Sequence, residues 1–166
     1  MPITQFLEDN ARKYANEVAL VELNPEIKEV RRTTWKEYEL IERPVGRAYR
    51  REITWRVMDE KANRCANLLI SRGVKKGDKV AILMMNGIEW LPIYFGALKA
   101  GALAVPLNFR YTAEEIRYCL DLADADVLMF GPEFIGRLEE IYDDLKCQMI
   151  YCGPGMTPSF AEITRS

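Results

Sequence analysis

Apolar positions follow two kinds of pattern along most of the chain, helical stripes and short continuous runs. A stripe with a period near 3.6 predicts a helix over residues 3–15, and the run from Val18 to Leu23 predicts a strand. From Thr54 onward the two patterns alternate regularly. Further helices are expected over residues 54–72, 88–99, 112–122 and 134–145, and further strands over residues 79–85, 102–107, 126–130 and 148–152.

The alternation of strand and helix predicts an α/β fold. Runs such as Lys79–Met85 are apolar almost throughout, which is typical of strands covered on both faces by helices. Strand-helix-strand units of this kind form parallel sheets, so we expect a three-layer sandwich with a mainly parallel sheet. Ligands bind beyond the carboxyl ends of such strands. The loops Asn86–Glu89, Asn108–Thr112 and Gly131–Glu133 are therefore the first places to look for a site.

Two stretches depart from this pattern. Residues 24–50 are charged, contain two prolines and show little periodicity, so they are interpreted as a surface insertion. Within them Thr34-Trp35-Lys36-Glu37 fits a capping box and predicts a helical turn. The tail has glycines and prolines without periodicity. The predicted organisation is an α/β subdomain over 1–152, with the charged insertion at about 24–50, and a linker or tail over 153–166.

Composition removes several classes of function. The 166 residues include no His, which excludes Ser-His-Asp and Cys-His nucleophilic catalysis and every zinc site that needs imidazole. A net charge of −2 does not indicate the positively charged surface that nucleic-acid binding requires. The four cysteines have no metal-knuckle spacing, and no secretory leader is visible, so we expect structural thiols, no metal site and a cytoplasmic protein. The apolar stretch 90–107 carries Lys99 and two prolines, so no transmembrane segment is expected.

The loop Asn108-Phe109-Arg110-Tyr111 holds the most promising chemistry. It joins a buried strand to a helix that opens with a capping box, Thr112 to Glu115, and a helix N-terminus favours anions. Arg110 offers a fork of donors suited to phosphate, and the two aromatic rings offer flat faces to a base or a pantetheine arm. The alternative is a solvated Arg beside packing aromatics. No Gly-rich phosphate motif and no catalytic carboxylate pair occur, so no catalytic residue is assigned.

The segment Ile53–Phe130 resembles the N-terminal region of AMP-forming acyl-CoA synthetases, the adenylating superfamily that includes acyl- and aryl-CoA ligases, luciferases and adenylation domains. The resemblance runs over about residues 1–152, and its matches fall in order at the family's spacing. The matching features are Thr54-Trp55, Asn63-Arg64 with Ala66-Asn67, Gly77-Asp78-Lys79-Val80-Ala81, Gly96 with Lys99-Ala100-Gly101-Ala102, Val105-Pro106-Leu107-Asn108, and Glu115.

The resemblance implies a two-step ligase. A carboxylic acid reacts with ATP, with Mg²⁺ offsetting the triphosphate charge, and the CoA thiol then displaces AMP from the acyl-adenylate. The family's phosphate loop ending in Pro-Lys-Gly, its Tyr-Gly-x-Thr-Glu segment, its ribose-binding Asp and its C-terminal lysine are absent from these 166 residues. The chain alone is therefore predicted to be inactive and to bind no cofactor tightly. By resemblance Asn108, Phe109 and Arg110 lie near the CoA nucleotide.

Three hypotheses stay open at this point. The chain is the N-terminal fragment of an acyl-CoA synthetase, a non-catalytic CoA- or partner-binding module that reuses the fold, or a nucleotide-binding α/β protein unrelated to ligases. Apolar surface that later segments of a synthetase would cover also predicts a homo-oligomer, with an interface rich in residues from Ile88–Leu98 or from the strand ends.

Overall fold

The computed structural model describes residues 2–24, 31–35, 38–42 and 49–153. The chain divides into two compact units, Met1–Asp59 and Glu60–Ser166. Helix α2 (Trp55–Ser71) passes through the boundary between them. The predicted organisation into residues 1–152 and a tail stays a prediction, and most of that tail, 154–166, lies outside the described residues.

The first unit contains one helix, two antiparallel strand pairs and the start of α2 among its described residues. Its elements are α1 (Ile3–Lys13), β1 (Val18–Asn24), β2 (Arg31–Trp35), β3 (Tyr38–Glu42) and β4 (Tyr49–Thr54). Strand β1 pairs with β4, from Val18 opposite Thr54 to Asn24 opposite Tyr49. The Thr54 hydroxyl then accepts a hydrogen bond from the Val57 amide at 3.3 Å, which caps α2 where the sequence predicts a helix start.

The helical turn predicted at Thr34–Glu37 is wrong for the part that the structure describes. Thr34 and Trp35 lie in strand β2, which pairs antiparallel with β3 from Arg31 opposite Glu42 to Trp35 opposite Tyr38. β-branched and aromatic residues favour strands, so Thr33-Thr34-Trp35 outweighs the capping pattern. Strand β4 was also not predicted, because its Tyr-Arg-Arg-Glu sequence has no apolar run.

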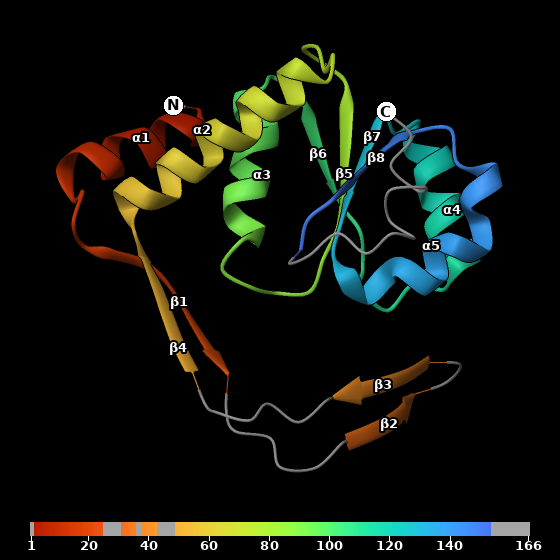
Figure 1. Cartoon of the computed structure of the whole chain (residues 1–166). Helices are drawn as coiled ribbons and strands as arrows, with labels where there is room; N and C mark the ends of the chain where they lie inside the picture. The colour runs from red at the N-terminus through yellow and green to blue at the C-terminus, as the bar shows by residue number, and fades with distance from the viewer. Residues whose placement is uncertain (1, 25–30, 36–37, 43–48, 154–166) are drawn as a thin grey trace. The chain divides into compact units, whose positions relative to one another are not determined.

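The second unit is the predicted α/β sandwich. Its strands are β5 (Lys79–Leu83), β6 (Leu103–Pro106), β7 (Val127–Phe130) and β8 (Gln148–Tyr151), and its helices after α2 are α3 (Trp90–Lys99), α4 (Ala113–Ala123) and α5 (Ile135–Ile141), with short 3₁₀ turns at Pro132–Phe134 and Tyr142–Asp144. The four strands form one parallel sheet in the order β6-β5-β7-β8. Helix α3 lies on one face of the sheet, and α4 and α5 lie on the other (Figure 1).

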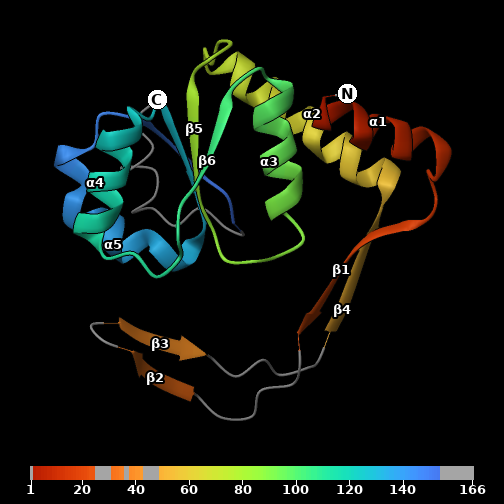
Figure 2. The same ribbon diagram turned by 180° about the vertical axis from the view of Figure 1, so that it is seen from behind.

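Successive strand residues supply the two faces of this sheet in turn. On β5, Val80 and Ile82 join the core under α2 and α3, whereas Ala81 and Leu83 join the core under α4 and α5. All four are fully buried. Covering both faces accounts for the unbroken apolar run that the sequence shows here. The view from behind shows the same three layers (Figure 2).

Two turns fix how the helices enter the sheet. Gly73 has a φ of +91°, the left-handed region that glycine adopts without strain, and it ends α2 as predicted. At the other helix, the Thr112 hydroxyl accepts from the Glu115 amide while the Glu115 carboxylate accepts from the Thr112 amide, which confirms the capping box. The helix predicted over 134–145 is shorter, since α5 spans only Ile135–Ile141 between two 3₁₀ turns.

The apolar stretch 90–107 forms α3 and β6 of the sandwich. Within the described parts of the chain, no helix combines the length and the apolar character that a bilayer crossing needs.

Candidate functional site

The carboxyl edge of the parallel sheet gathers the three predicted loops. The connection from β5 runs through α3 to β6 on one face, and the return from β6 runs through α4 to β7 on the other face. The chain therefore reverses direction across the sheet between β5 and β7, which is the switch point where α/β proteins bind ligands. Main-chain pairing continues to this edge: the Leu107 amide donates to Ile82 and the Gly131 amide donates to Leu83.

Asn108 shapes the loop that follows β6. Its side-chain oxygen accepts from the Arg110 amide at 3.0 Å, and its main-chain oxygen accepts from the Tyr111 amide at 3.1 Å. This Asx turn reverses the chain between β6 and α4. The Asn108 side chain therefore has a structural task, which the sequence analysis did not assign to it.

Arg110 lies over the ring of its neighbour. Its guanidinium carbon is 5.3 Å from the centre of the Phe109 ring, within the range of a cation–π contact. Phe109 is half-buried against the core under α4 and α5, whereas Arg110 is exposed. The loop thus presents a cation supported by an anchored aromatic ring. The next ring is that of Tyr111, whose pKa is raised by repulsion from the Cys119 thiolate, by desolvation and by a hydrogen bond to Cys119 on α4.

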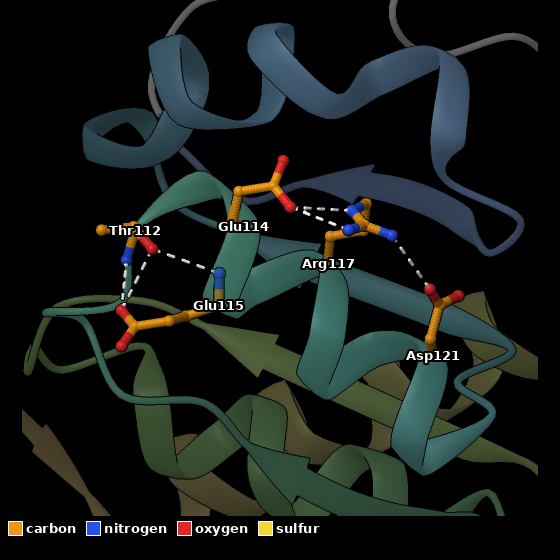
Figure 3. Close-up of polar contacts among 5 residues, drawn as sticks. All are labelled: Thr112, Glu114, Glu115, Arg117 and Asp121. Atoms are coloured by element: carbon orange, nitrogen blue, oxygen red, sulfur yellow. Dashed lines mark hydrogen bonds and ion pairs between the residues drawn. The ribbon is translucent and has the colours of Figure 1, made fainter.

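The N-terminus of α4 is less open to anions than the sequence suggests. The capping box already engages the amides of Thr112 and Glu115, and the Glu115 carboxylate lies 2.9 Å from the Thr112 nitrogen (Figure 3). Glu114 adds a second carboxylate in the same turn, hydrogen-bonded to Arg117 at 2.8 Å. Two acidic side chains repel a phosphate at this position. Arg110, rather than the helix terminus, is therefore the group of this loop that suits an anion.

The loop after β5 is held by an ion pair. Lys61 of α2 donates to both carboxylate oxygens of Glu89, at 3.0 and 3.1 Å. Ile88 is buried. The contact fixes the approach to α3, and Glu89 is a paired structural carboxylate.

The loop after β7 leads to a residue that the sequence analysis missed. Phe134 is almost fully buried, and the guanidinium carbon of Arg137 lies 5.6 Å from its ring centre. One nitrogen of Arg137, Nη1, donates to the main-chain oxygens of Phe109 at 2.8 Å and Tyr111 at 3.0 Å. Nothing in the sequence around Arg137 distinguishes it from a solvated helix residue. The contact spans 26 and 28 residues, so no local pattern could have revealed it.

Other polar groups add no second site among the described residues. No group of three His, Cys, Asp or Glu side chains there could hold a metal ion. A cavity of about 100 Å³ lies at the opposite, amino edge of the sheet, between the segments that precede β7 and β8. All four cysteines are free. Burial raises the pKa of Cys65 and Cys147 to about 11 and that of Cys152 to about 12, so these thiols stay protonated and weakly reactive at neutral pH.

Comparison with known proteins identifies the family to which this fold and these loops belong. The family model described as AMP-binding enzyme matches residues 7–151. The chain belongs to this family. The hypothesis of an α/β protein unrelated to ligases is therefore wrong.

Two curated relatives within the AMP-binding family are fatty-acid ligases. The long-chain-fatty-acid–CoA ligase FadD13 of Mycobacterium tuberculosis is 42% identical over 79 residues, which is 48% of this chain and 16% of that protein. A medium/long-chain-fatty-acid–CoA/3-oxocholest-4-en-26-oate–CoA ligase of Mycobacterium marinum is 38% identical over 93 residues, 56% of this chain and 17% of that protein. The chain thus spans about a sixth of the length of these relatives.

Solved structures of AMP-binding enzymes share the fold. The anthranilate CoA ligase AuaEII in complex with anthranoyl-AMP has a TM-score of 0.70 at 27% identity, over 92% of this chain and 25% of that one. The inhibitor-bound N-terminal domain of FACL13 from Mycobacterium tuberculosis has a TM-score of 0.66 at 26% identity, over 99% of this chain and 35% of that one. Recognition of the adenylating fold from the sequence is confirmed.

Proposed function

We propose that this chain is the N-terminal part of an AMP-forming acyl-CoA synthetase that converts a fatty acid, ATP and CoA into acyl-CoA, AMP and pyrophosphate. The family match over 7–151 carries the proposal. The fatty acid is proposed because relatives at 38–42% identity are named for fatty acids. Its proposed location is the cytoplasm, where a protein with four free thiols meets a reducing environment.

The proposed task of this part is to contact the nucleotide of CoA. Arg110 is exposed, and its guanidinium matches the geometry of a phosphate oxygen pair. The Phe109 ring makes a cation–π contact with this guanidinium and offers an aromatic face next to it. Asn108 holds the turn that sets both. These three residues are proposed to bind the phosphorylated ribose end of CoA, leaving the thiol to react elsewhere in the synthetase.

ATP and Mg²⁺ are proposed as partners of the full-length enzyme, where the cation offsets the charge of the triphosphate. The residues described here do not fit either group. They include no cluster of three metal-ligating side chains, and the sequence has no Gly-rich phosphate loop. No step of the reaction is assigned to them, and the acid-binding and adenylating groups belong to other parts of the enzyme.

The isolated 166-residue chain is expected to be inactive, because it has none of the family's phosphate-loop or lysine motifs. The measurement is acid-dependent release of pyrophosphate from ATP with a panel of fatty and aromatic acids. No release above a no-acid blank is expected. Turnover that rises with acid concentration would overturn this part of the proposal. Reading the coding DNA beyond Ser166 separates a synthetase fragment, which continues into a Pro-Lys-Gly loop, from a short non-catalytic CoA- or partner-binding module.

Binding of CoA to the proposed loop can be measured on the same chain. Millimolar CoA added to ¹⁵N-labelled protein is expected to shift the amide signals of Phe109 and Arg110, with weak affinity. Dephospho-CoA, which lacks the 3′-phosphate, should bind more weakly. Arg110→Gln should reduce CoA affinity by about tenfold, the effect of one lost charge-assisted contact. Arg72→Gln, the same charge change at an exposed residue of the turn after α2, is the matched control. Equal affinities for the two variants would refute the assignment.

A further inference from the structure

The loop proposed to bind CoA is held from outside by one side chain of α5. Arg137 Nη1 donates to the carbonyls of Phe109 and Tyr111, the residues on either side of Arg110. Asn108 holds the same loop from within, through the Arg110 and Tyr111 amides. The main chain around Arg110 is thus restrained at two carbonyls and two amides.

Arg137 is itself placed by packing. Its guanidinium lies 5.6 Å from the ring centre of Phe134, a residue with 1% of its surface exposed. Arg137 is half-buried. A planar cation between a buried ring and two carbonyls loses little entropy on forming each hydrogen bond. Lysine lacks the planar head that lies against the Phe134 ring, but its ammonium group could still donate to the carbonyls, as the single nitrogen Nη1 does here.

The two carbonyls also matter for charge. A carbonyl oxygen carries a partial negative charge, and two of them beside Arg110 would oppose the approach of a phosphate. Arg137 offsets this partial negative charge because its guanidinium donates hydrogen bonds to both oxygens. Its positive charge also adds a second cation close to the loop. Arg110 itself is exposed and lies over the Phe109 ring.

We propose that Arg137 is a positioning residue for CoA, which holds the loop carbonyls so that Arg110 meets the 3′-phosphate of the nucleotide. This inference rests on the proposed function of the loop. It adds a role for helix α5, which follows β7, in the function of a loop that follows β6.

The test combines CoA affinity with amide hydrogen exchange in the ligand-free chain. Arg137→Gln is expected to weaken CoA by about tenfold and to speed exchange of the Tyr111 amide by a similar factor. Arg110→Gln should weaken CoA without changing exchange. Arg72→Gln should change neither. Arg137→Lys keeps a charged donor for the two carbonyls, so it should lose less CoA affinity than Arg137→Gln, and a Lys variant as weak as Arg137→Gln would overturn the proposal.

Two further outcomes separate a failure of the positioning role from a failure of the proposed CoA-binding loop. Arg137→Gln that binds CoA like the wild type overturns the positioning role and leaves the loop proposal intact. A wild-type chain whose loop signals do not respond to CoA refutes the proposed function and this inference with it. If Arg137→Gln loses the dispersed signals of the folded sheet, Arg137→Met serves instead, since it keeps an unbranched apolar side chain beside Phe134 and removes the donor to the two carbonyls. It should give the same pair of effects, and unchanged CoA affinity in that variant would contradict the proposal.

Discussion

At the scale of single residues, the cysteines show how burial decides reactivity. Sequence position suggested that Cys65 packs as a small apolar residue, and its side chain does contribute to the core under α2 and α3. Cys152 contributes to the same core. Its pKa rises to about 12 because burial removes water from the thiolate and because the nearby Cys65 would repel it. These thiols serve packing rather than chemistry.

The raised thiol pKa values predict a loss of stability at alkaline pH. In the unfolded chain a thiol ionises near pH 8.5, whereas Cys65 and Cys147 keep their protons in the fold to about pH 11 and Cys152 to about pH 12. Between these values the folded state binds more protons than the unfolded state, so the free energy of unfolding falls as pH rises. Urea unfolding under reducing conditions at pH 8 and pH 10.5 measures the fall. Replacing all three cysteines by Ala should make it smaller. An equal fall in that variant would show that the thiols do not cause it.

At the scale of elements, the close contact between α2 and α3 depends on one glycine. A Cβ atom added at Gly96 would lie 2.5 Å from Cβ and 2.7 Å from Sγ of Cys65, and 3.0 Å from the main-chain oxygen of Ala62. The Cys65 Cβ and the Ala62 oxygen are fixed by the helix backbone, so rotation of the Cys65 Sγ alone cannot relieve the contact. The sequence shows a glycine in an apolar helix, which ordinarily weakens the helix. Only the packing explains why glycine suits this position.

Gly96→Ala is therefore expected to destabilise the chain by about 1–3 kcal/mol, the usual cost of overpacking, despite the better helix propensity of Ala. Gly136→Ala is the matched control, because Gly136 lies on α5 with nothing within 4 Å of an added Cβ. It should leave stability unchanged or raise it by up to about 1 kcal/mol. Chemical denaturation of both variants gives the comparison. A Gly96→Ala variant as stable as Gly136→Ala would contradict the close packing of the two helices.

How far the sequence predicts each element depends on how local its cause is. The strands of the parallel sheet are visible because burial on both faces leaves an apolar run, as in Val127–Phe130. The capping box at Thr112 is visible because its partners are three residues apart. Strand β4 is hidden, since its structure comes from pairing with β1, about thirty residues away. Arg137 is hidden for the same reason: its partners belong to another loop of the sheet edge.

At the scale of the whole molecule, the structure changes where an interface between copies is expected. The sequence favoured Ile88–Leu98 or the strand ends, but Ile88, Ile93 and Phe95 of the first alternative are buried. The exposed apolar side chains of the second unit lie elsewhere. Tyr118 and Leu122, which are 63% and 72% exposed, form an i, i+4 pair on α4. Leu103, 57% exposed, lies on β6, the strand at one end of the sheet order.

The chain is accordingly predicted to form a homodimer or larger assembly through α4 or the β6 edge. Exposed apolar ridges favour association, and a strand with one unpaired side can recruit another. A specific interface would bury about 1,000 Å² or more in total.

Light scattering at micromolar concentration should give at least twice the 19.2 kDa of one chain. Replacing Tyr118 and Leu122 together by Lys should shift the mass toward the monomer if α4 forms the interface. Glu139→Gln and Glu140→Gln, introduced together on the exposed side of α5, make the same change of +2 in net charge and should not shift the mass. A wild-type chain that stays monomeric and binds no apolar dye would show that its surface needs no cover, and the prediction would be wrong.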